Sequence, residues 1–393
     1  MILSQSKYPS MRIKMFRIST TLLALLLGML LVFLLSMIGS KTRGPLSDLL
    51  SFASGSMQKM EENFIISSRE QRRANKLKWL QPYRADASLL KTPKTILLGA
   101  FDNNTREGFE SIVSLEDSIK NTLPLIHIYT AWGSKPEEEF PALQVKSIIE
   151  LGSIPVITWE PWLTDFDPDK YPQLRKLEDR DKGGLADIAH GKYDFYISRW
   201  ADGAKKINSQ LFLRVGHEMN DPYRYPWGPQ NNTAKDFIAA WKHIREIFKK
   251  QNVTNVVWVW SPHPAYGYFD AYYPGDSLVD YIGVSALNYG TVASWSKWWT
   301  FKEIFGNYYK DFVHFRKPIM ITEFGSLAVG GNRSKWFTDA LDSMPQKYPY
   351  VKAIVFFHYS DDKTTTQQVI NWYFKNDAPV TRSITKEIQG WGK

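Results

Sequence analysis

Eight short apolar runs, separated by segments long enough for a returning helix, are the feature of this sequence that most limits its fold. Each run has the length of a buried strand. They are Thr95–Ala100, Pro124–Tyr129, Ile154–Trp159, Leu211–Gly216, Val256–Trp260, Tyr281–Ser285, Ile319–Thr322 and Val351–Phe357. Between two of them a helix is expected over Ala234–Lys250, where Phe237, Trp241, Ile244 and Phe248 recur at helical spacing. Eight strands that alternate with helices over roughly 250 residues indicate an α/β fold.

The ends of these runs favour a TIM (β/α)8 barrel over a doubly wound sheet, which shows the same alternation. Nearly every run ends in aromatic and polar residues, such as Trp159–Trp162 after the third and Asn288–Tyr289 after the sixth. In a barrel the carboxyl ends of all strands meet at one mouth, where the ligand site lies. The aromatic share of the chain is 15%, and tryptophan and tyrosine rings offer apolar faces that suit the CH faces of sugars. We therefore predict a barrel with an aromatic-lined mouth.

The residues ahead of the barrel divide into three segments. Residues 1–17 contain four basic residues and no acid, and we predict a cytoplasmic tail there. Residues 18–39 are uncharged and long enough to span a bilayer, which predicts one transmembrane signal-anchor; a cleaved signal peptide is the alternative. Residues 40–91 read as a polar stem, with a basic helix over 61–80, and residues 92–393 as the barrel domain. The positive-inside rule then gives a single-pass protein of the cell membrane, with its barrel outside the cytoplasm.

Composition excludes several kinds of site. The chain contains no cysteine, which rules out disulfides and thiolate-bound metals. Its net charge of +9 comes largely from the tail and the stem, so no nucleic-acid partner is expected. No motif has the spacing of a metal site, because His217 and Glu218 are adjacent in sequence. We expect no cofactor and no metal.

The fourth and seventh runs carry the residues best suited to catalysis. The fourth run changes abruptly from apolar residues to the polar groups of Arg214, His217, Glu218 and Asn220, and the seventh ends at Glu323. Two carboxyl groups on either side of a bond are the equipment of glycoside hydrolysis, and a separation of about 5–5.5 Å gives the retaining mechanism. Glu218 and Glu323 are the predicted catalytic pair, with Arg214 to stabilise nearby negative charge. His217 points to the other side of its strand unless the backbone bends there.

Several motifs carry a resemblance to a known family. They include Leu213–Asn220 (LRVGHEMN), Tyr225–Gly228 (YPWG), Asn255–Pro262 (NVVWVWSP) and Ile321–Gly325 (ITEFG). In this order, across about residues 94–360, they resemble the motifs of glycoside hydrolase family 26.

The resemblance implies a TIM barrel of the retaining clan, with Glu218 as acid/base and Glu323 as nucleophile. It also implies substrate-binding roles for His217, Asn220, Trp227 and aromatic residues near strands three and six. The full set of predicted binding residues is His217, Arg214, Asn220, Trp159, Trp162, Trp227, Tyr289 and Trp260. Activities of such a family are endo-hydrolysis of β-1,4-mannan and, in some members, of mixed-linkage β-glucan or β-1,3-xylan.

The chain departs from the family pattern at two places. Asp221 stands where the family usually has glycine, and the loop up to Arg224 is about one residue longer. After strand six, Leu287 replaces a tyrosine that commonly touches the nucleophile, and Tyr289 is a candidate substitute. Both departures lie beside the sugar pocket, so they bear on the choice of sugar more than on hydrolysis.

These observations predict a membrane-anchored retaining endo-β-glycosidase that cuts a β-linked polysaccharide, with β-1,4-mannan or a related glycan first among the substrates. A mixed-linkage β-glucanase or a transglycosylase would use the same site. The alternative from another class is a non-hydrolytic glycan-binding or exopolysaccharide-assembly barrel. The expected partners are the polysaccharide, the membrane and machinery for exopolysaccharide synthesis or export.

Overall fold

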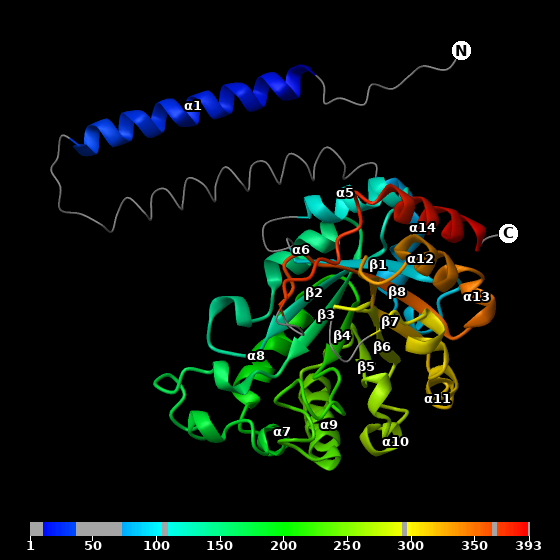
Figure 1. The fold of residues 1–393 in the computed structure, drawn as a ribbon. Helices are drawn as coiled ribbons and strands as arrows, with labels where there is room; N and C mark the ends of the chain where they lie inside the picture. Colours follow the sequence, from blue (N-terminus) through cyan, green and yellow to red (C-terminus); the bar gives the residue numbers. More distant parts are fainter. Residues whose placement is uncertain (1–10, 37–72, 104–108, 293–296, 364–367, 392–393) are drawn as a thin grey trace. The chain divides into compact units, whose positions relative to one another are not determined.

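Eight parallel strands close into one barrel in the order of the sequence, with β1 paired to β8 (Figure 1). The computed structural model describes residues 11–36, 73–103, 109–292, 297–363 and 368–391. The strands are β1 Leu97–Asp102, β2 Leu125–Ala131, β3 Ile154–Glu160, β4 Leu211–Val215, β5 Val256–Trp260, β6 Tyr281–Asn288, β7 Ile319–Ser326 and β8 Val351–His358. Every one of the eight predicted runs forms a strand, and the predicted TIM barrel is confirmed.

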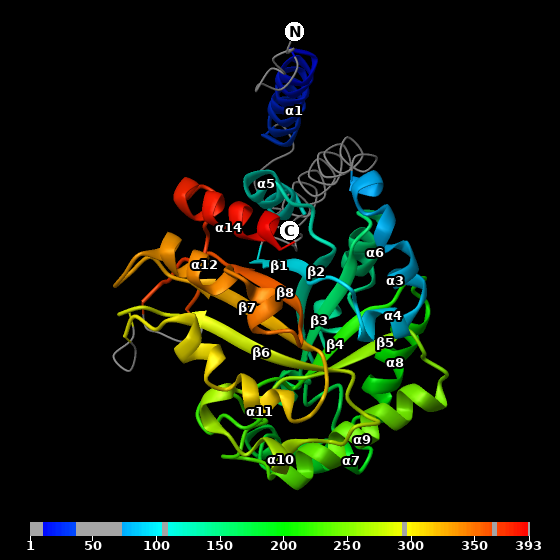
Figure 2. The ribbon, with the colours of Figure 1, turned by 90° about the vertical axis from the view of Figure 1, so that its right-hand side faces the viewer.

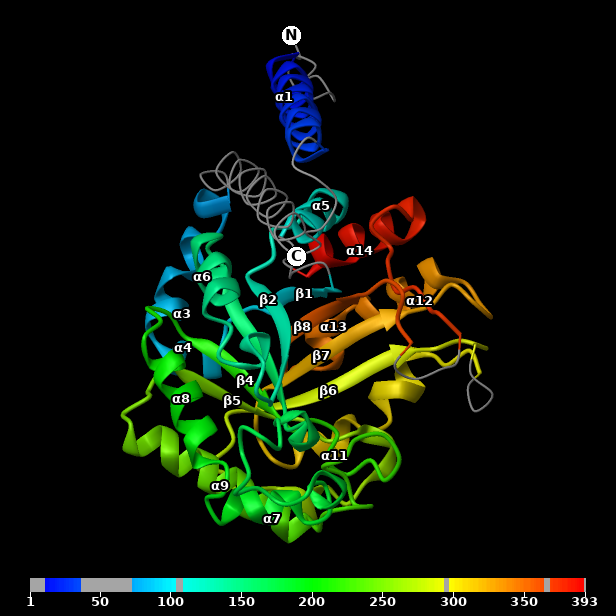
Figure 3. The same cartoon turned by 90° about the vertical axis from the view of Figure 1, so that its left-hand side faces the viewer.

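Helices cover the outside of the strands (Figure 2 and Figure 3). They are α3 Gln81–Ala85, α4 Ala87–Lys91, α5 Glu110–Ile119, α6 Ala142–Glu150, α7 Gly184–Ala189, α8 Asp194–Lys205, α9 Ala234–Lys250, α10 Phe269–Tyr272, α11 Tyr309–Val313, α12 Arg333–Leu341, α13 Met344–Lys347 and α14 Ala378–Gly390. Helix α9 has the predicted bounds, and it begins at a capping box between Thr233 and Asp236. Helix α14 packs against both α5 and α12, which joins the end of the barrel to its beginning.

The core of the barrel has two apolar layers because side chains alternate along each strand. One layer fills the interior and includes Val156, Phe212 and Val257. The other lies between the strands and the helices, and Trp159 of β3 belongs to it together with Trp200 of α8. Residues that differ by one position on a strand therefore face different layers.

Residues 73–91, which the sequence analysis gave to the stem, pack against the end of the barrel where the strands begin. Leu77, Leu80 and Leu90 are buried in the same apolar cluster as the interior residues of the strands. The phenol of Tyr281, from inside the barrel, donates a hydrogen bond to the carbonyl of Leu90. Residues 73–91 therefore form a cap on this end of the barrel, and their buried leucines are part of the barrel's core.

The tail and the predicted membrane segment are described only in part. Residues 11–36 form helix α1, Met11–Ser36, while residues 1–10, 37–39 and the rest of the stem up to residue 72 lie outside the described residues. Among the residues that are described, no helix is both long and apolar enough to cross a membrane. The transmembrane segment predicted over residues 18–39 is therefore not supported by the structure.

Replacement of Leu80 by alanine tests whether the cap belongs to the folded barrel. Leu80 is fully buried, so we expect Leu80→Ala to lower the free energy of unfolding by about 2–5 kcal/mol, measured by urea denaturation. Leu89 lies on the neighbouring helix α4 with 39% of its surface exposed, and Leu89→Ala is expected to change stability by no more than about 0.5 kcal/mol. Equal stability of the two variants would contradict the packing of this segment.

Candidate active site

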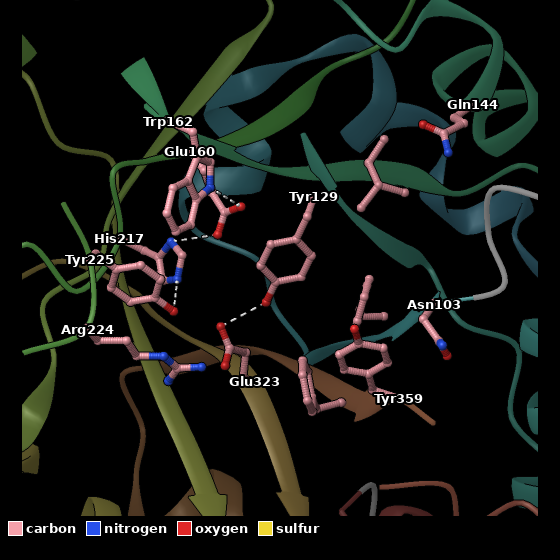
Figure 4. A pocket seen from close by; sticks show the side chains of 13 residues that line it. Asn103, Tyr129, Gln144, Glu160, Trp162, His217, Arg224, Tyr225, Glu323 and Tyr359 are labelled. Carbon is pink, nitrogen blue, oxygen red and sulfur yellow. Dashed lines mark hydrogen bonds and ion pairs between the residues drawn. The ribbon is translucent and has the colours of Figure 1, made fainter. Parts of the chain in front are cut away.

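A cleft of about 630 Å³ opens at the carboxyl ends of the strands (Figure 4). It is lined by Phe101, Asn103, Ile128, Tyr129, Gln144, Glu160, Trp162, His217, Arg224, Tyr225, Glu323, Phe357 and Tyr359. These residues come from β1, β2, β3, β7 and β8, from helix α6, and from the segments that follow β1, β3, β4 and β8. The position agrees with the rule that barrel ligand sites lie at this face.

Glu323 enters the cleft because β7 carries a bulge. In the pairing with β6, Ile321 lies opposite Val284 and Glu323 lies opposite Ser285, which leaves Thr322 as an extra residue. Regular alternation would turn Glu323 toward the outer helices, and the bulge reverses its direction. Phe324 takes the outward position and packs in the outer layer.

Both hydrogen bonds to Glu323 fall on one oxygen. Arg214 donates from Nη1 to Oε1 at 2.7 Å, and the phenol of Tyr129 donates to the same oxygen at 2.8 Å. The other oxygen, Oε2, accepts no hydrogen bond from any described residue. One carboxylate oxygen is thus held by a cation and a phenol while the second remains for a substrate atom.

Arg214 lies beneath the cleft with no exposed surface. Its other hydrogen bonds go to hydroxyl groups, from Nε to Ser261 after β5 at 3.0 Å, from Nη2 to Ser285 of β6 at 3.2 Å, and from Nη1 to Thr158 of β3 at 3.4 Å. Burial lowers the pKa of Arg214, but the negative charges of Glu323 and Glu218 outweigh burial and raise it above its ordinary value. The predicted contact between Arg214 and Glu323 is present.

Glu218 is buried beside the cleft and is not among the side chains that line it. Its φ is +54°, a left-handed conformation that is strained for a non-glycine residue, and its backbone N–H donates to the carbonyl of Ser261 at 2.6 Å. Arg224 Nη1 lies 3.7 Å from Oε2 of Glu218. Burial raises the pKa of Glu218, but His263, Arg224 and Arg214 outweigh burial, so the pKa lies below its ordinary value.

His217 reaches the cleft because the backbone bends just before it. Strand β4 ends at Val215, and Gly216 has a φ of +49°, which only glycine adopts readily. The ring of His217 then lies 2.9 Å, at Nε2, from the phenol oxygen of Tyr225. Burial and the nearby Arg214 lower the pKa of His217 well below its ordinary value, so the imidazole is neutral.

Glu160 is a cleft residue that sequence reasoning missed. Its Oε2 accepts a hydrogen bond from Trp162 Nε1 at 3.1 Å, and its Oε1 lies 3.8 Å from Nδ1 of His217. Burial raises its pKa to about 7. Alternation of side chains along β3 could have identified Glu160, because Val156 and Thr158 precede it at interior positions.

The same alternation explains why Trp159 and Trp260 do not line the cleft, contrary to their predicted binding roles. Both side chains are fully buried in the outer layer. The ring of Trp159 lies 4.4 Å from that of Trp200, and the ring of Trp260 lies 5.1 Å from that of Tyr273. The prediction assumed that every side chain at a strand end faces the mouth, whereas side chains alternate and half of them face the helices.

The remaining predicted binding residues differ in their access to the cleft. Trp162 lines it, as predicted. Trp227 is 2% exposed and stacks behind Tyr225, with ring centroids 4.6 Å apart. Asn220 joins two loops, because its side chain donates to the carbonyls of His263 and Gly267 at 2.9 Å each. Trp227 and Asn220 thus support the wall and the loops behind it.

The tyrosine that contacts Glu323 comes from an unexpected strand. Tyr289 was the candidate for this contact, and its ring packs at 5.0 Å against that of Trp372. The contact to Glu323 is made by Tyr129 of β2. Glu323 therefore has a phenol donor although Leu287 of β6 provides none.

In the part of the chain that the structure describes, one group of three side chains has donor atoms close enough to hold a divalent ion. Glu218, Asp221 and His263 each offer one atom within 4.8 Å of the others. Arg224 already places a positive charge 3.7 Å from Glu218. An ion would have to compete with this guanidinium, so we assign no metal here.

Comparison with known proteins places residues 177–378 within the family model described as Glycosyl hydrolase family 26. Endoglucanase H of Acetivibrio thermocellus is 32% identical over 297 residues, which cover 73% of this chain and 30% of that protein. A mannan endo-1,4-beta-mannosidase of Bacillus subtilis (strain 168) is 27% identical over 177 residues, 42% of this chain and 44% of that protein. The chain thus spans less than half the length of these two relatives.

Solved structures share the fold at lower sequence identity. GH26C from Muricauda sp. MAR_2010_75 has a TM-score of 0.55 at 19% identity and covers 75% of this chain and 87% of its own. A GH26 beta-mannanase from Bacteroides ovatus has a TM-score of 0.54 at 17% identity, covering 76% of this chain and 90% of its own. At this level of identity the likeness concerns the barrel alone.

Removal of Arg214 tests the charge arrangement beneath the cleft. Arg214→Leu leaves Glu323 buried without its cation, and we expect the free energy of unfolding to fall by about 3–5 kcal/mol in urea denaturation. The double variant Arg214→Leu/Glu323→Gln buries no unpaired charge, so it is expected to recover most of that loss. Lys347→Ala breaks an exposed ion pair with Asp342 and serves as the control, with little change expected. A double variant no more stable than Arg214→Leu would contradict this account.

Proposed function

The chain belongs to glycosyl hydrolase family 26, and we propose that it hydrolyses the β-glycosidic bonds of a polysaccharide by a retaining, two-step mechanism. The observation that carries the proposal is the state of Glu323. Its carboxylate lies in an aromatic-lined cleft, with Oε1 held by Arg214 and Tyr129 and Oε2 without a described donor. A nucleophile needs this combination of a fixed orientation and one available oxygen.

In the first step, Oε2 of Glu323 attacks the anomeric carbon while the bond from that carbon to the bridging oxygen breaks. The bridging oxygen takes a proton from Glu218 and leaves as an alcohol. In the second step, Glu218 removes a proton from water, and the oxygen of that water attacks the same carbon. The ester bond to Glu323 then breaks, and both carboxyl groups return to their initial states. Two inversions at one carbon retain its configuration.

The acid role of Glu218 requires a change on substrate binding. In the free protein, the positive charge of Arg224 helps to hold the pKa of Glu218 below its ordinary value, which favours the carboxylate. Arg224 lines the cleft, so a bound sugar competes for its position. Displacement of this guanidinium would remove a cation from Glu218 and raise its affinity for a proton. We propose that substrate binding prepares the proton donor in this way.

We propose β-1,4-mannan or a related β-glucan as the substrate class. Curated relatives of the chain are named as a mannan endo-1,4-beta-mannosidase and as Endoglucanase H, and a weaker match is named as a beta-1,3-xylanase. The aromatic residues of the cleft, among them Trp162 and Tyr359, offer apolar faces to pyranose rings. Reducing-end assays on mannan, mixed-linkage β-glucan and β-1,3-xylan test the choice. Binding without new reducing ends on every polymer would favour the non-hydrolytic alternative, and longer products would indicate transglycosylation.

Substitution of the two glutamates tests the mechanism. Glu323→Gln is expected to lower kcat on the polysaccharide by more than about 10³-fold, because no covalent intermediate forms. Glu218→Gln is expected to lower it by about 10²–10⁴-fold, because the leaving oxygen lacks a proton donor. On an aryl glycoside whose phenolate leaves without a proton, only Glu323→Gln is expected to block formation of the glycosyl-enzyme. The release of aryl alcohol in a pre-steady-state burst measures this step.

Glu178→Gln is the matched control, because Glu178 is an exposed glutamate that does not line the cleft, and full activity is expected. A polysaccharide kcat for Glu323→Gln close to that of the unchanged protein would end the proposed mechanism. Proton NMR of the first product checks the retained configuration independently.

The location of the enzyme is a proposal from the sequence. Four basic residues precede the uncharged residues 18–39, and a polymeric glycan is met outside the cytoplasm. We expect the full chain to remain in the membrane pellet after an alkaline carbonate wash, and a chain that begins at Arg73 to be recovered in the supernatant. Release of the full chain by carbonate would contradict anchoring.

A further inference from the structure

Three side chains of the cleft wall lie in a row: Glu160 at the end of β3, His217 after β4, and Tyr225 in the loop that follows (Figure 4). Oε1 of Glu160 lies 3.8 Å from Nδ1 of His217, and Nε2 of His217 lies 2.9 Å from the phenol oxygen of Tyr225. All three line the cleft. The row thus connects a carboxyl group, through an imidazole, to a phenol that faces the substrate space.

The buried Nδ1 of His217 has no hydrogen-bond partner in the described chain. A neutral imidazole has one N–H donor and one acceptor nitrogen, and each costs free energy if it is buried without a partner. Glu160 is the side chain nearest to this nitrogen for which an interaction is found. The 3.8 Å separation exceeds a hydrogen bond, and catalytic contacts of this kind often tighten when substrate binds.

We propose that Glu160 is a positioning residue whose own proton sets the direction in which Tyr225 donates. When Glu160 is protonated, its O–H donates to Nδ1 of His217. The imidazole then carries its hydrogen on Nε2 and donates it to the phenol oxygen of Tyr225. Because that oxygen is now an acceptor, the phenol O–H of Tyr225 is directed into the cleft, where it donates to a sugar oxygen.

Ionisation of Glu160 reverses the donor and acceptor roles along the row. The carboxylate accepts a hydrogen bond from Nδ1–H of His217, so Nε2 loses its hydrogen and becomes an acceptor. Tyr225 then donates its O–H to Nε2, and the cleft loses a donor. The imidazole and the phenol together keep both of their hydrogens in this exchange. The imidazole hydrogen moves between the two ring nitrogens of His217 through solvent or substrate, and the phenol hydrogen of Tyr225 turns from the cleft toward Nε2.

The charges around Glu160 place this reversal near neutral pH. Burial is the largest cause and raises the pKa of Glu160. The hydrogen bond from Trp162 and the charges of Arg214 and Arg224 lower it, while the charge of Glu323 raises it. The result is a pKa of about 7. The imidazole of His217 stays neutral over this range, because burial and the nearby arginines hold its pKa well below its ordinary value. A carboxyl group with a raised pKa is protonated below that value, so the donor at Tyr225 is present in acid and withdrawn above about pH 7.

The kinetic test rests on the proposed hydrolysis and follows KM across neutral pH on the best polysaccharide. We expect KM of the unchanged protein to rise about 3- to 10-fold as Glu160 ionises, the cost of one lost hydrogen bond. In Glu160→Gln, the amide oxygen accepts from Trp162 and the amide N–H donates to His217 at every pH, so this rise is expected to vanish. Tyr225→Phe lacks the donor and is expected to show the higher KM at every pH. Glu178→Gln changes an exposed residue that does not line the cleft, so it is expected to keep the rise.

A second measurement does not depend on activity. Nitrogen NMR of ¹⁵N-histidine-labelled protein reports which ring nitrogen of His217 carries hydrogen, with His217→Asn used to assign the signal. Below about pH 7 we expect hydrogen on Nε2, and above it on Nδ1, while Glu160→Gln keeps the Nε2 form throughout. If hydrolysis is absent on every glycan but the tautomer changes as described, the proposed function fails and the role of Glu160 stands.

Two results would overturn the inference. One is a His217 tautomer that does not change with pH in the unchanged protein, or that changes equally in Glu160→Gln. The other is a loss of kcat in Glu160→Gln that is confined to substrates with poor leaving groups, since this pattern would make Glu160 a proton donor to the leaving oxygen. A purely structural role would move neither the tautomer nor the pH profile of KM.

Discussion

The ion pair between Arg214 and Glu323 is the interaction on which the carboxyl-terminal half of the barrel, where the cleft opens, depends. Two buried charges lose several kcal/mol of hydration each, and their attraction offsets this cost only when further hydrogen bonds satisfy the remaining donors and acceptors. The guanidinium is satisfied by hydroxyl groups of Ser261 and Ser285, and the carboxylate by the phenol of Tyr129. One arginine thereby joins groups from strands on several sides of the barrel, and the position of each strand end is tied to a charge at the centre.

This charged layer rests on an apolar one. Below it, the interior is filled by side chains such as Phe212 and Val257, and the segment around Leu80 closes the end of the barrel. Water is excluded from below, so the effective dielectric constant near the cleft is low and charges act strongly on one another. The neutral state of His217 and the raised pKa of Glu160 follow from this arrangement, because burial is the largest cause of each shift.

The sequence predicted the barrel well because its signal is periodic and repeated. Eight apolar runs give eight strands, and polar residues at their ends mark the mouth. The site was predicted less completely, because its side chains are aimed by local irregularities. A bulge at Thr322 turns Glu323 inward, and left-handed residues after β4 turn His217 into the cleft. Strict alternation fails at these two places, yet it holds on β3, where it selects Glu160 and excludes Trp159. Telling the two cases apart requires the backbone.

Arg224 shows how one loop residue changes the electrostatics beside the cleft. It stands in the loop after β4, lies 5.1 Å from the ring centre of Tyr225, and places Nη1 3.7 Å from Oε2 of Glu218. Together with His263, this guanidinium holds the pKa of Glu218 below its ordinary value, which favours the carboxylate. Two carboxyl groups therefore have opposite tendencies, Glu218 beside the cleft toward ionisation and Glu160 on the cleft wall toward protonation. If Glu218 is the proton donor, as we propose, the binding of substrate against Arg224 has to supply the free energy that moves a proton to Glu218.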